Sequence, residues 1–313
     1  MSTSSEGNVG LTIGLIFALL STASVFVYWL NKKNPDKDYS ELIARTRSWW
    51  VMIGLFSAAI LFGSTTTVIF FGFVSFLGLK EYFSMVPTRR ADRRVLFWCY
   101  LSIIFQYLWV SQSWYGMFII FIPVYMFLLI PIRMLFLRET DGFLRSASTI
   151  QWGLMITVFG LSHAALLTTV EHTQTGIKGY GAALLLYLVF LTQFNDVAQY
   201  VWGKSFGKHK ISPSVSPNKT YEGFIGGALT TMVLAAIIAP WLTPLSLIHS
   251  LSAGLIISVG GFIGDLNISA IKRDMGVKDS SSLIPGHGGV LDRVDSLSFT
   301  APLFFHFIFF FYY

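Results

Sequence analysis

Long runs of apolar residues, separated by short polar stretches, dominate the chain. A helix that spans a membrane needs about 20 mostly apolar residues, and most of these runs approach that length. The pattern therefore predicts an all-α polytopic membrane protein with about nine to ten transmembrane helices, of which the second, fourth and last are short. The predicted spans are Val9–Leu30, Trp49–Phe62, Thr65–Phe83, Val95–Val110, Trp114–Ile132, Ile150–Val170, Gly179–Trp202, Phe224–Pro240, Leu247–Ile271 and Leu297–Tyr313.

Composition supports the same class. Of the 313 residues, 54% are hydrophobic and 12% are charged, against about 25% charged in a soluble domain. Cys99 is the only cysteine and lies in an apolar run, so a disulfide framework and a cysteine-based metal site are excluded. The segment before Val9 has no Lys or Arg, and the following apolar run is long for a signal peptide, which favours a retained anchor helix over a cleaved leader.

Basic residues alternate between the connections. The odd-numbered connections carry many, whereas the even-numbered ones carry almost none, Lys178 being the exception. Because basic loops stay in the cytoplasm, we expect the odd connections there and both termini on the other side. The net charge of +6 then indicates anionic headgroups or phosphates as partners, and no nucleic acid. The basic residues before the last odd connection are Lys32, Lys33, Lys37, Arg45, Arg47, Arg89, Arg90, Arg93, Arg94, Arg133, Arg138, Arg145, Lys204, Lys208, Lys210 and Lys219.

The chain divides into three regions without a soluble domain. Residues 1–48 are an N-terminal anchor helix and a basic cytoplasmic loop, 49–175 hold further transmembrane helices, and 176–313 form a C-terminal region with the candidate site. Only the last region places carboxylates, amides and glycines within or beside spans. Ionisable residues inside a membrane are costly, which makes them functional candidates.

Asp196 lies well inside a predicted span. Gln199, Tyr200 and Gly203 follow it at helical spacing and are expected to share its face. The alternative is a buried aspartate that pairs with a basic neighbour for packing alone.

Asp265, Ser269 and Lys272 form one stripe of another predicted helix. Asp265 lies at a depth similar to that of Asp196, so the two carboxylates could hold a divalent cation between them. Magnesium favours such a site, with one or two carboxylates and phosphate oxygens from the substrate. The alternative is a buried ion pair between Asp265 and Lys272.

Two loops add phosphate-binding chemistry. The first, SPNKTYEGFIGG at 216–227, offers Lys219 to a phosphate, while its glycines are expected to serve helix packing. The second, PGHGGVLDRVD at 285–295, is too rich in Gly and Pro for a helix in its first half and could form an anion-binding nest. Asp292 and Asp295 then begin the next helix, where the simpler interpretation is a capped helix start beside a solvated loop.

These motifs resemble those of the phosphatidate cytidylyltransferase (CDP-diacylglycerol synthase) family. Residues 269–296 contain its S-x-x-K-R, K-D, P-G-H-G-G and D-R-x-D elements in order. The upstream S-P-x-K-T and G-F-x-G-G elements are present, as is D-x-x-x-Y-x-x-G from Asp196 to Gly203. The resemblance covers about residues 190–300. It is specific because the whole series of motifs occurs in order.

The resemblance implies transfer of CMP from CTP to phosphatidic acid, or a related acidic lipid, at the cytoplasmic face of a bacterial inner (cell) membrane. The products would be CDP-diacylglycerol, for phospholipid biosynthesis, and pyrophosphate. The implied cofactor is Mg²⁺, alone or with a second cation, and the implied assembly includes a homodimer. The implied catalytic residues are Asp265, Asp196, Lys272, Lys219 and Asp292; the metal ligands are Asp196, Asp265 and Asp292; and the substrate-binding residues are Ser216, Asn218, Lys219, Thr220, Arg273, Lys278, Asp279, His287, Gly288, Gly289 and Arg293.

Alternative functions remain at this point. A CTP-dependent polyprenol or lipid kinase would use the same nucleotide but transfer its γ-phosphate. Gln199, where the family pattern favours a small residue, and the extra segment Val9–Leu30 leave room for a different acidic lipid as acceptor. A transporter is disfavoured because the charges gather at one interface and no inverted pair of broken spans is evident. Walker, GxSxG and HExxH motifs, and the D-G-x-x-A-R motif of CDP-alcohol phosphatidyltransferases, are missing.

Overall fold

The computed structural model describes residues 5–34, 36, 38–89, 92–136, 139–169 and 180–312. Four basic residues of the predicted loops, Lys37, Arg90, Arg138 and Lys178, lie outside these ranges, as do the predicted span ends Val170, Gly179 and Tyr313. The elements are α1 Ser5–Lys33, α2 Ser40–Leu61, α3 Ser64–Met85, α4 Arg93–Ser111, α5 Tyr115–Ile120, π-helix η1 Phe121–Met126, α6 Phe127–Leu135, α7 Phe143–Leu154, π-helix η2 Met155–Gly160, α8 Leu161–Leu166, α9 Tyr180–Phe206, β1 Lys210–Ser212, β2 Ser216–Thr220, α10 Tyr221–Leu242, α11 Leu247–Asp274, α12 Leu291–Val294 and α13 Leu297–Tyr312.

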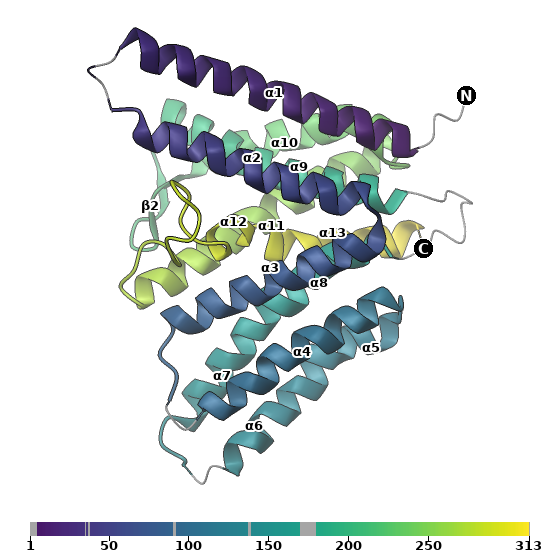
Figure 1. Ribbon diagram of the computed structural model, residues 1–313, viewed down its shortest axis with the longest axis vertical. Helices are drawn as coiled ribbons and strands as arrows, with labels where there is room; N and C mark the ends of the chain where they lie inside the picture. The colour runs from purple at the N-terminus through teal and green to yellow at the C-terminus, as the bar shows by residue number, and fades with distance from the viewer. Residues whose placement is uncertain are drawn as a thin grey trace.

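The fold is an up-and-down bundle of apolar helices, as predicted. Nine helical segments of the described chain are long and apolar enough to cross a membrane, which makes this a multi-pass membrane protein. α2 is not among the nine because it carries Glu41, Arg45 and Arg47 in its first two turns. It nevertheless runs antiparallel to α1 along the bundle (Figure 1). The start of α1 and the end of α13 lie at the same end of the bundle (Figure 1).

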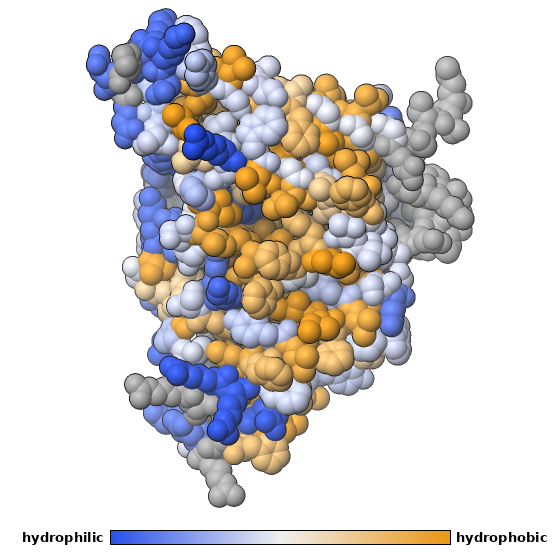
Figure 2. All heavy atoms as spheres, viewed as in Figure 1, coloured by the Kyte–Doolittle hydropathy of each residue, from blue (hydrophilic) through white to orange (hydrophobic). Residues whose placement is uncertain are grey.

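We call the opposite end the hairpin end, because it carries β1, β2 and the loop 275–290 (Figure 1). The two strands pair antiparallel, with Lys210 opposite Thr220 and Ser212 opposite Ser216. The segment around Pro217, predicted to be a loop, is therefore the second strand of this hairpin. Figure 2 shows apolar side chains over the middle of the bundle and hydrophilic ones gathered along the hairpin end.

Close packing of α9, α10 and α11 brings the candidate segments together. A Cβ atom at Gly223 would overlap the backbone of Gly203, and one at Gly226 would meet the ring of Trp202. Gly227 lies equally close to Gln199. The predicted packing role of these glycines is confirmed, since any side chain there would separate α9 from α10.

Candidate functional site

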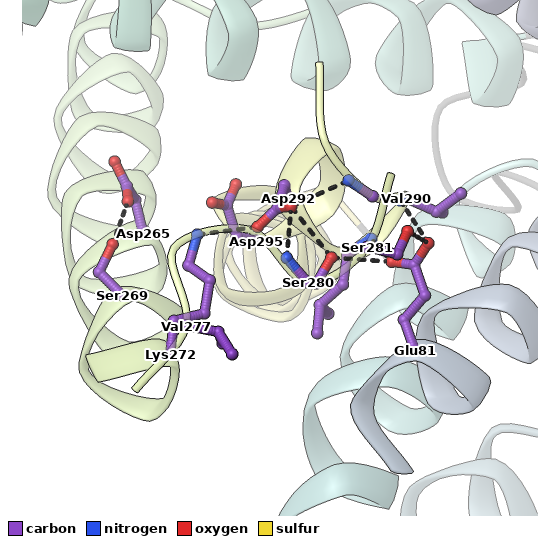
Figure 3. A network of polar contacts seen from close by, with 12 residues as sticks. Glu81, Asp265, Ser269, Lys272, Val277, Ser280, Ser281, Val290, Asp292 and Asp295 are labelled. Carbon is purple, nitrogen blue, oxygen red and sulfur yellow. Dashed lines mark hydrogen bonds and ion pairs between the residues drawn. The ribbon is translucent and has the colours of Figure 1, made fainter. Parts of the chain in front are cut away.

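Three carboxylates from three parts of the chain gather near the hairpin end. Asp196 belongs to α9 and Asp265 to α11, while Asp295 follows α12. The carboxylate of Asp295 is close enough to the other two for direct electrostatic repulsion, and its residue is only 9% exposed. Figure 3 shows the side chains of Asp265 and Asp295 beside each other. Such a concentration of negative charge is costly unless a cation or a proton offsets it.

Hydroxyl groups orient two of these carboxylates. Ser296 Oγ lies 3.2 and 3.1 Å from the two carboxylate oxygens of Asp196. Ser269 Oγ donates to Asp265 Oδ1 at 3.1 Å, as the shared helical stripe predicted. Serine donors hold the carboxylate planes in place and leave other lone pairs for a ligand.

Lys219 forms an ion pair with this cluster. Its Nζ lies 2.8 Å from Asp265 Oδ2, and 4.6 Å from the centroid of the Phe262 ring. The hairpin brings Lys219 to this position because β2 ends directly at the start of α10. An ammonium group at the edge of a carboxylate cluster could bind a phosphate as well as an aspartate.

Lys272 has a different partner from the one considered above. The alternative of a buried Asp265–Lys272 pair is wrong: Lys272 Nζ lies 2.8 Å from Asp292 Oδ1. Although Lys272 shares a helical stripe with Asp265, its long side chain extends from α11 to the start of α12. Both residues of this pair are buried, Lys272 at 9% exposure and Asp292 at 6%.

Asp292 is also held by the loop that precedes it. Its Oδ2 accepts from Ser280 N at 2.8 Å and Gly289 N at 2.9 Å, and Ser280 Oγ lies 3.0 Å from it (Figure 3). Asp292 therefore ties α11, the loop and α12 together, whereas Asp295 faces the other two carboxylates. Within the described ranges, no set of three or more His, Cys, Asp or Glu side chains has the arrangement of a protein-only metal cage.

The loop 275–290 contains the predicted nucleotide-binding residues His287, Gly288 and Gly289. As predicted, it has no helix before α12, and a single antiparallel bridge joins Ile284 to Gly288. Gly288 has φ of +77°, a conformation that favours glycine, and a Cβ there would overlap Asp292 Oδ2.

α2 supports the outer side of this loop. Arg45 Nε donates to Gly286 O at 3.1 Å, and Ser48 Oγ donates to Pro285 O at 2.8 Å. The ring of Trp49 meets that of His287 edge to face. Burial, with the positive charge of Arg293 as a smaller cause, holds the pKa of His287 below its usual value.

The other predicted binding residues lie around this centre. Thr220 Oγ1 accepts from Gly223 N and caps α10, while Arg273 Nε donates to Val215 O at 3.3 Å. These two side chains hold the hairpin against α10 and α11. Ser216 is partly buried in β2, Arg293 is partly buried in α12, and Asn218, Lys278 and Asp279 are exposed.

Gln199, a departure from the family pattern, belongs to a buried amide network. Gln199 Nε2 donates to Asn195 Oδ1 at 3.1 Å. The same oxygen accepts from Thr231 Oγ1 at 3.2 Å and Ser258 Oγ at 2.9 Å. The glycine at 227 makes room for the Gln199 side chain. This network joins α9, α10 and α11 at Asn195, the residue that directly precedes Asp196.

Sequence reasoning missed two residues of this region. The sequence predicts Asp295 only as a helix-start residue, although it is the last residue of the D-R-x-D element. Glu81 was missed altogether, although it is an acidic residue within the predicted span Thr65–Phe83. Its carboxylate accepts hydrogen bonds from Ser280, Ser281, Val290 and Leu291 (Figure 3).

The fold and site are those of an integral membrane protein whose helices gather carboxylates, lysines and a glycine-rich loop at one end, which are residue types that bind cations and phosphate groups. Comparison with known proteins identifies the family: the chain belongs to the cytidylyltransferase family, whose profile matches residues 43–311. This confirms the family resemblance and implies CTP as a substrate.

Individual relatives agree with this assignment. The chain is 44% identical to the uncharacterized protein YnbB of Escherichia coli over 297 residues, which is 95% of this chain and 97% of that protein. It is 46% identical over 137 residues to a phosphatidate cytidylyltransferase of Haemophilus influenzae, covering 42% and 47% of the two chains. A phosphatidate cytidylyltransferase of Staphylococcus haemolyticus is 29% identical over 260 residues, covering 83% and 96%.

Proposed function

We propose that this protein transfers CMP from CTP to phosphatidic acid at the cytoplasmic face of a bacterial cell membrane. A phosphate oxygen of the lipid attacks the α-phosphorus of CTP, the bond to the β-phosphate oxygen breaks, and pyrophosphate leaves. The observation that carries the proposal is the meeting of Asp196, Asp265 and Asp295 beside Lys219. The acceptor is inferred from the Haemophilus and Staphylococcus relatives, which are phosphatidate cytidylyltransferases by name.

The chemistry of the donor set fits Mg²⁺. Magnesium binds to one or two carboxylates together with substrate phosphates and water, so a full protein cage is unnecessary. Asp196 and Asp265 would hold the ion. Asp295 is a further candidate ligand because its carboxylate lies close to both. When bound, the ion would offset the charge of the triphosphate and polarise its phosphoryl oxygens.

The protein's own residues supply position and charge. Lys219, which pairs with Asp265, is placed to hold a phosphate of CTP or of the lipid. Lys272 is fixed by Asp292 and adds positive potential beside the cluster. His287, Gly288 and Gly289 would shape the loop over the nucleotide. Catalysis of this type rests on positioning and electrostatic stabilisation rather than on a protein nucleophile.

Incubation of the purified protein with CTP, Mg²⁺ and phosphatidic acid tests the proposal. The expected products are pyrophosphate and a CMP-bearing lipid in equal amounts. Release of CDP with a phosphorylated lipid would instead establish a CTP-dependent lipid kinase, an alternative that family membership disfavours. Parallel reactions with other acidic phospholipids test the acceptor: turnover with one of them and none with phosphatidic acid would replace the proposed substrate.

A further inference from the structure

Glu81 lies on α3, in the half of the chain that precedes all the recognised motifs, yet its side chain lies within the signature loop. Oε2 accepts from Ser280 Oγ at 2.9 Å and from Leu291 N at 2.8 Å. Oε1 accepts from Ser281 Oγ at 2.7 Å and from Val290 N at 3.0 Å. Each carboxylate oxygen thus receives one hydroxyl and one backbone N–H, which uses the acceptor capacity of the group.

The Glu81 carboxylate is buried, and hydrogen bonds rather than an ion pair hold it. Glu81 is 6% exposed, and none of the ion pairs found among the described residues includes it. A buried charge is costly unless hydrogen bonds stabilise it. Four donors at normal distances provide that stabilisation, and all four belong to the loop and the start of α12. The loop therefore has the donors that a buried carboxylate needs at this position.

The four donors mark both ends of one segment. Ser280 and Ser281 begin it, and Val290 and Leu291 end it where α12 starts. A single side chain therefore closes the loop that carries His287, Gly288 and Gly289. Gly289 shows how tight this closure is, because a Cβ atom there would overlap both Ser280 Oγ and Glu81 Oε2.

The closure extends to the charged residues of the site. Ser280 Oγ contacts Asp292 Oδ2 as well as Glu81, and Asp292 in turn holds Lys272. An unbroken series of polar contacts thus runs from α3 through the loop to the last turn of α11 (Figure 3). A displacement of the Glu81 carboxylate would move the loop, Asp292 and Lys272 together.

We propose that Glu81 is a positioning residue: it fixes the loop 280–291 in the shape that binds the nucleotide, without contacting the substrate itself. The kinetic part of this inference rests on the proposed function, whereas the structural part does not. A glutamine should fail here, because its amide NH₂ would face a backbone N–H donor that cannot reverse its direction.

Hydrogen–deuterium exchange on the full-length protein in detergent tests the structural part. In Glu81→Gln, peptides that cover residues 280–291 should exchange about tenfold faster than in wild type, while α9 and α11 stay protected. Ser75→Ala is the matched control: Ser75 is a buried polar residue of the same helix, and its Oγ bonds to Tyr107 Oη rather than to the loop. Unchanged exchange in Glu81→Gln, or an equal change in both variants, overturns the proposal.

Steady-state kinetics tests the positioning role. Glu81→Gln should raise the KM for CTP about tenfold, as expected from the loss of hydrogen bonds to a charged group. A merely structural defect would lower the active fraction and thus kcat, without moving KM. Faster loop exchange with an unchanged KM would therefore refute the positioning role. If wild type shows no CTP turnover, the proposed function fails, while the exchange result still decides whether Glu81 holds the loop.

If Glu81→Gln does not fold, Ser281→Ala can be used for the same measurement. It removes one donor to Oε1 and leaves the carboxylate in place. Its loop peptides should exchange faster than those of Ser75→Ala, and wild-type exchange in Ser281→Ala would again overturn the proposal.

Discussion

Lys219 and Asp265 form an ion pair between the hairpin and α11, with Nζ 2.8 Å from Oδ2. Both side chains are partly exposed, Lys219 at 17% and Asp265 at 31%, so a ligand can reach them. The pair neutralises only one carboxylate of the cluster, because Asp196 and Asp295 have no ion-pair partner among the described residues within 4.0 Å. The Mg²⁺ proposed above would offset the two remaining carboxylates.

Asp265→Asn should abolish turnover and leave the protein folded. The amide keeps the shape of the side chain and its bond from Ser269 but loses the charge needed by a cation. We expect a fall in kcat of about a hundredfold or more, with a normal elution profile and melting temperature. Asp274→Asn is the matched control, since it changes an exposed carboxylate at the end of the same helix. Near-normal turnover in Asp265→Asn would refute the metal-site assignment.

Lys219→Ala should raise the requirement for one of the two substrates. Loss of a charge-assisted contact to phosphate predicts an increase in KM of roughly 10- to 100-fold. Titrations of CTP at fixed lipid, and of lipid at fixed CTP, show which substrate the ammonium group contacts. Lys210→Ala is the comparison, because Lys210 is an exposed lysine of the same hairpin. If neither KM changes, the contact role of Lys219 is wrong.

Asp295→Asn should weaken the affinity for magnesium rather than the binding of CTP. Asp295 faces Asp196 and Asp265, while its Oδ1 accepts from Ser296 N at 2.8 Å, a bond that asparagine can keep. Chelation of divalent cations should stop wild-type turnover. The variant should need about tenfold more Mg²⁺ for half-maximal rate and recover in part at high Mg²⁺. Identical magnesium curves for variant and wild type would exclude Asp295 from the site.

The site residues that could be predicted from the sequence are those whose signal lies in their immediate sequence neighbourhood. Asp196, Asp265 and Lys219 each stand out as a charge within or beside an apolar run, and the alternation of basic loops places them at one end of the bundle. Their partners did not follow from this. Whether Lys272 would pair with Asp265 or with Asp292 depends on where α12 begins, and the helical stripe alone favoured the wrong one.

Glu81 shows that contacts between distant parts of the chain cannot be predicted from local sequence. Its partners Ser280 and Leu291 lie about 200 residues further along the chain, and no periodicity within α3 relates it to them. Asp292 and Asp295 show the same limit over a short distance. They are three residues apart, but the helix is interrupted at 295–296 between α12 and α13, so their side chains face different partners. Packing of distant segments, rather than local preference, decides such contacts.

Asn195→Ala should destabilise the C-terminal bundle without touching a charged residue. Its Oδ1 accepts from Gln199, Thr231 and Ser258, so truncation leaves two buried donors and a partly buried one without this acceptor. We expect a loss of roughly 1–3 kcal/mol of stability, measured as a lower melting temperature in detergent. Thr192→Val removes a single buried hydrogen bond, between the hydroxyls of Thr192 and Thr300, and should lower the melting temperature less. Equal melting temperatures for the two variants would contradict the central role of Asn195.

His287 should make the loop less stable in mild acid. Its pKa in the folded protein is lowered by burial and by Arg293, so the folded state favours the neutral ring. Above the unfolded value of about 6.5 both states are neutral and the group contributes nothing to the pH dependence. As pH falls below that value, the unfolded state takes up the proton first, and stability decreases until the folded pKa is reached. We would compare melting temperatures at pH 7.5 and pH 5.5, each about one unit from the unfolded pKa. Between these two pH values, the melting temperature of wild type should fall more than that of His287→Gln. A larger fall in the melting temperature of His287→Gln than in that of wild type would mean that folding raises the His287 pKa instead of lowering it.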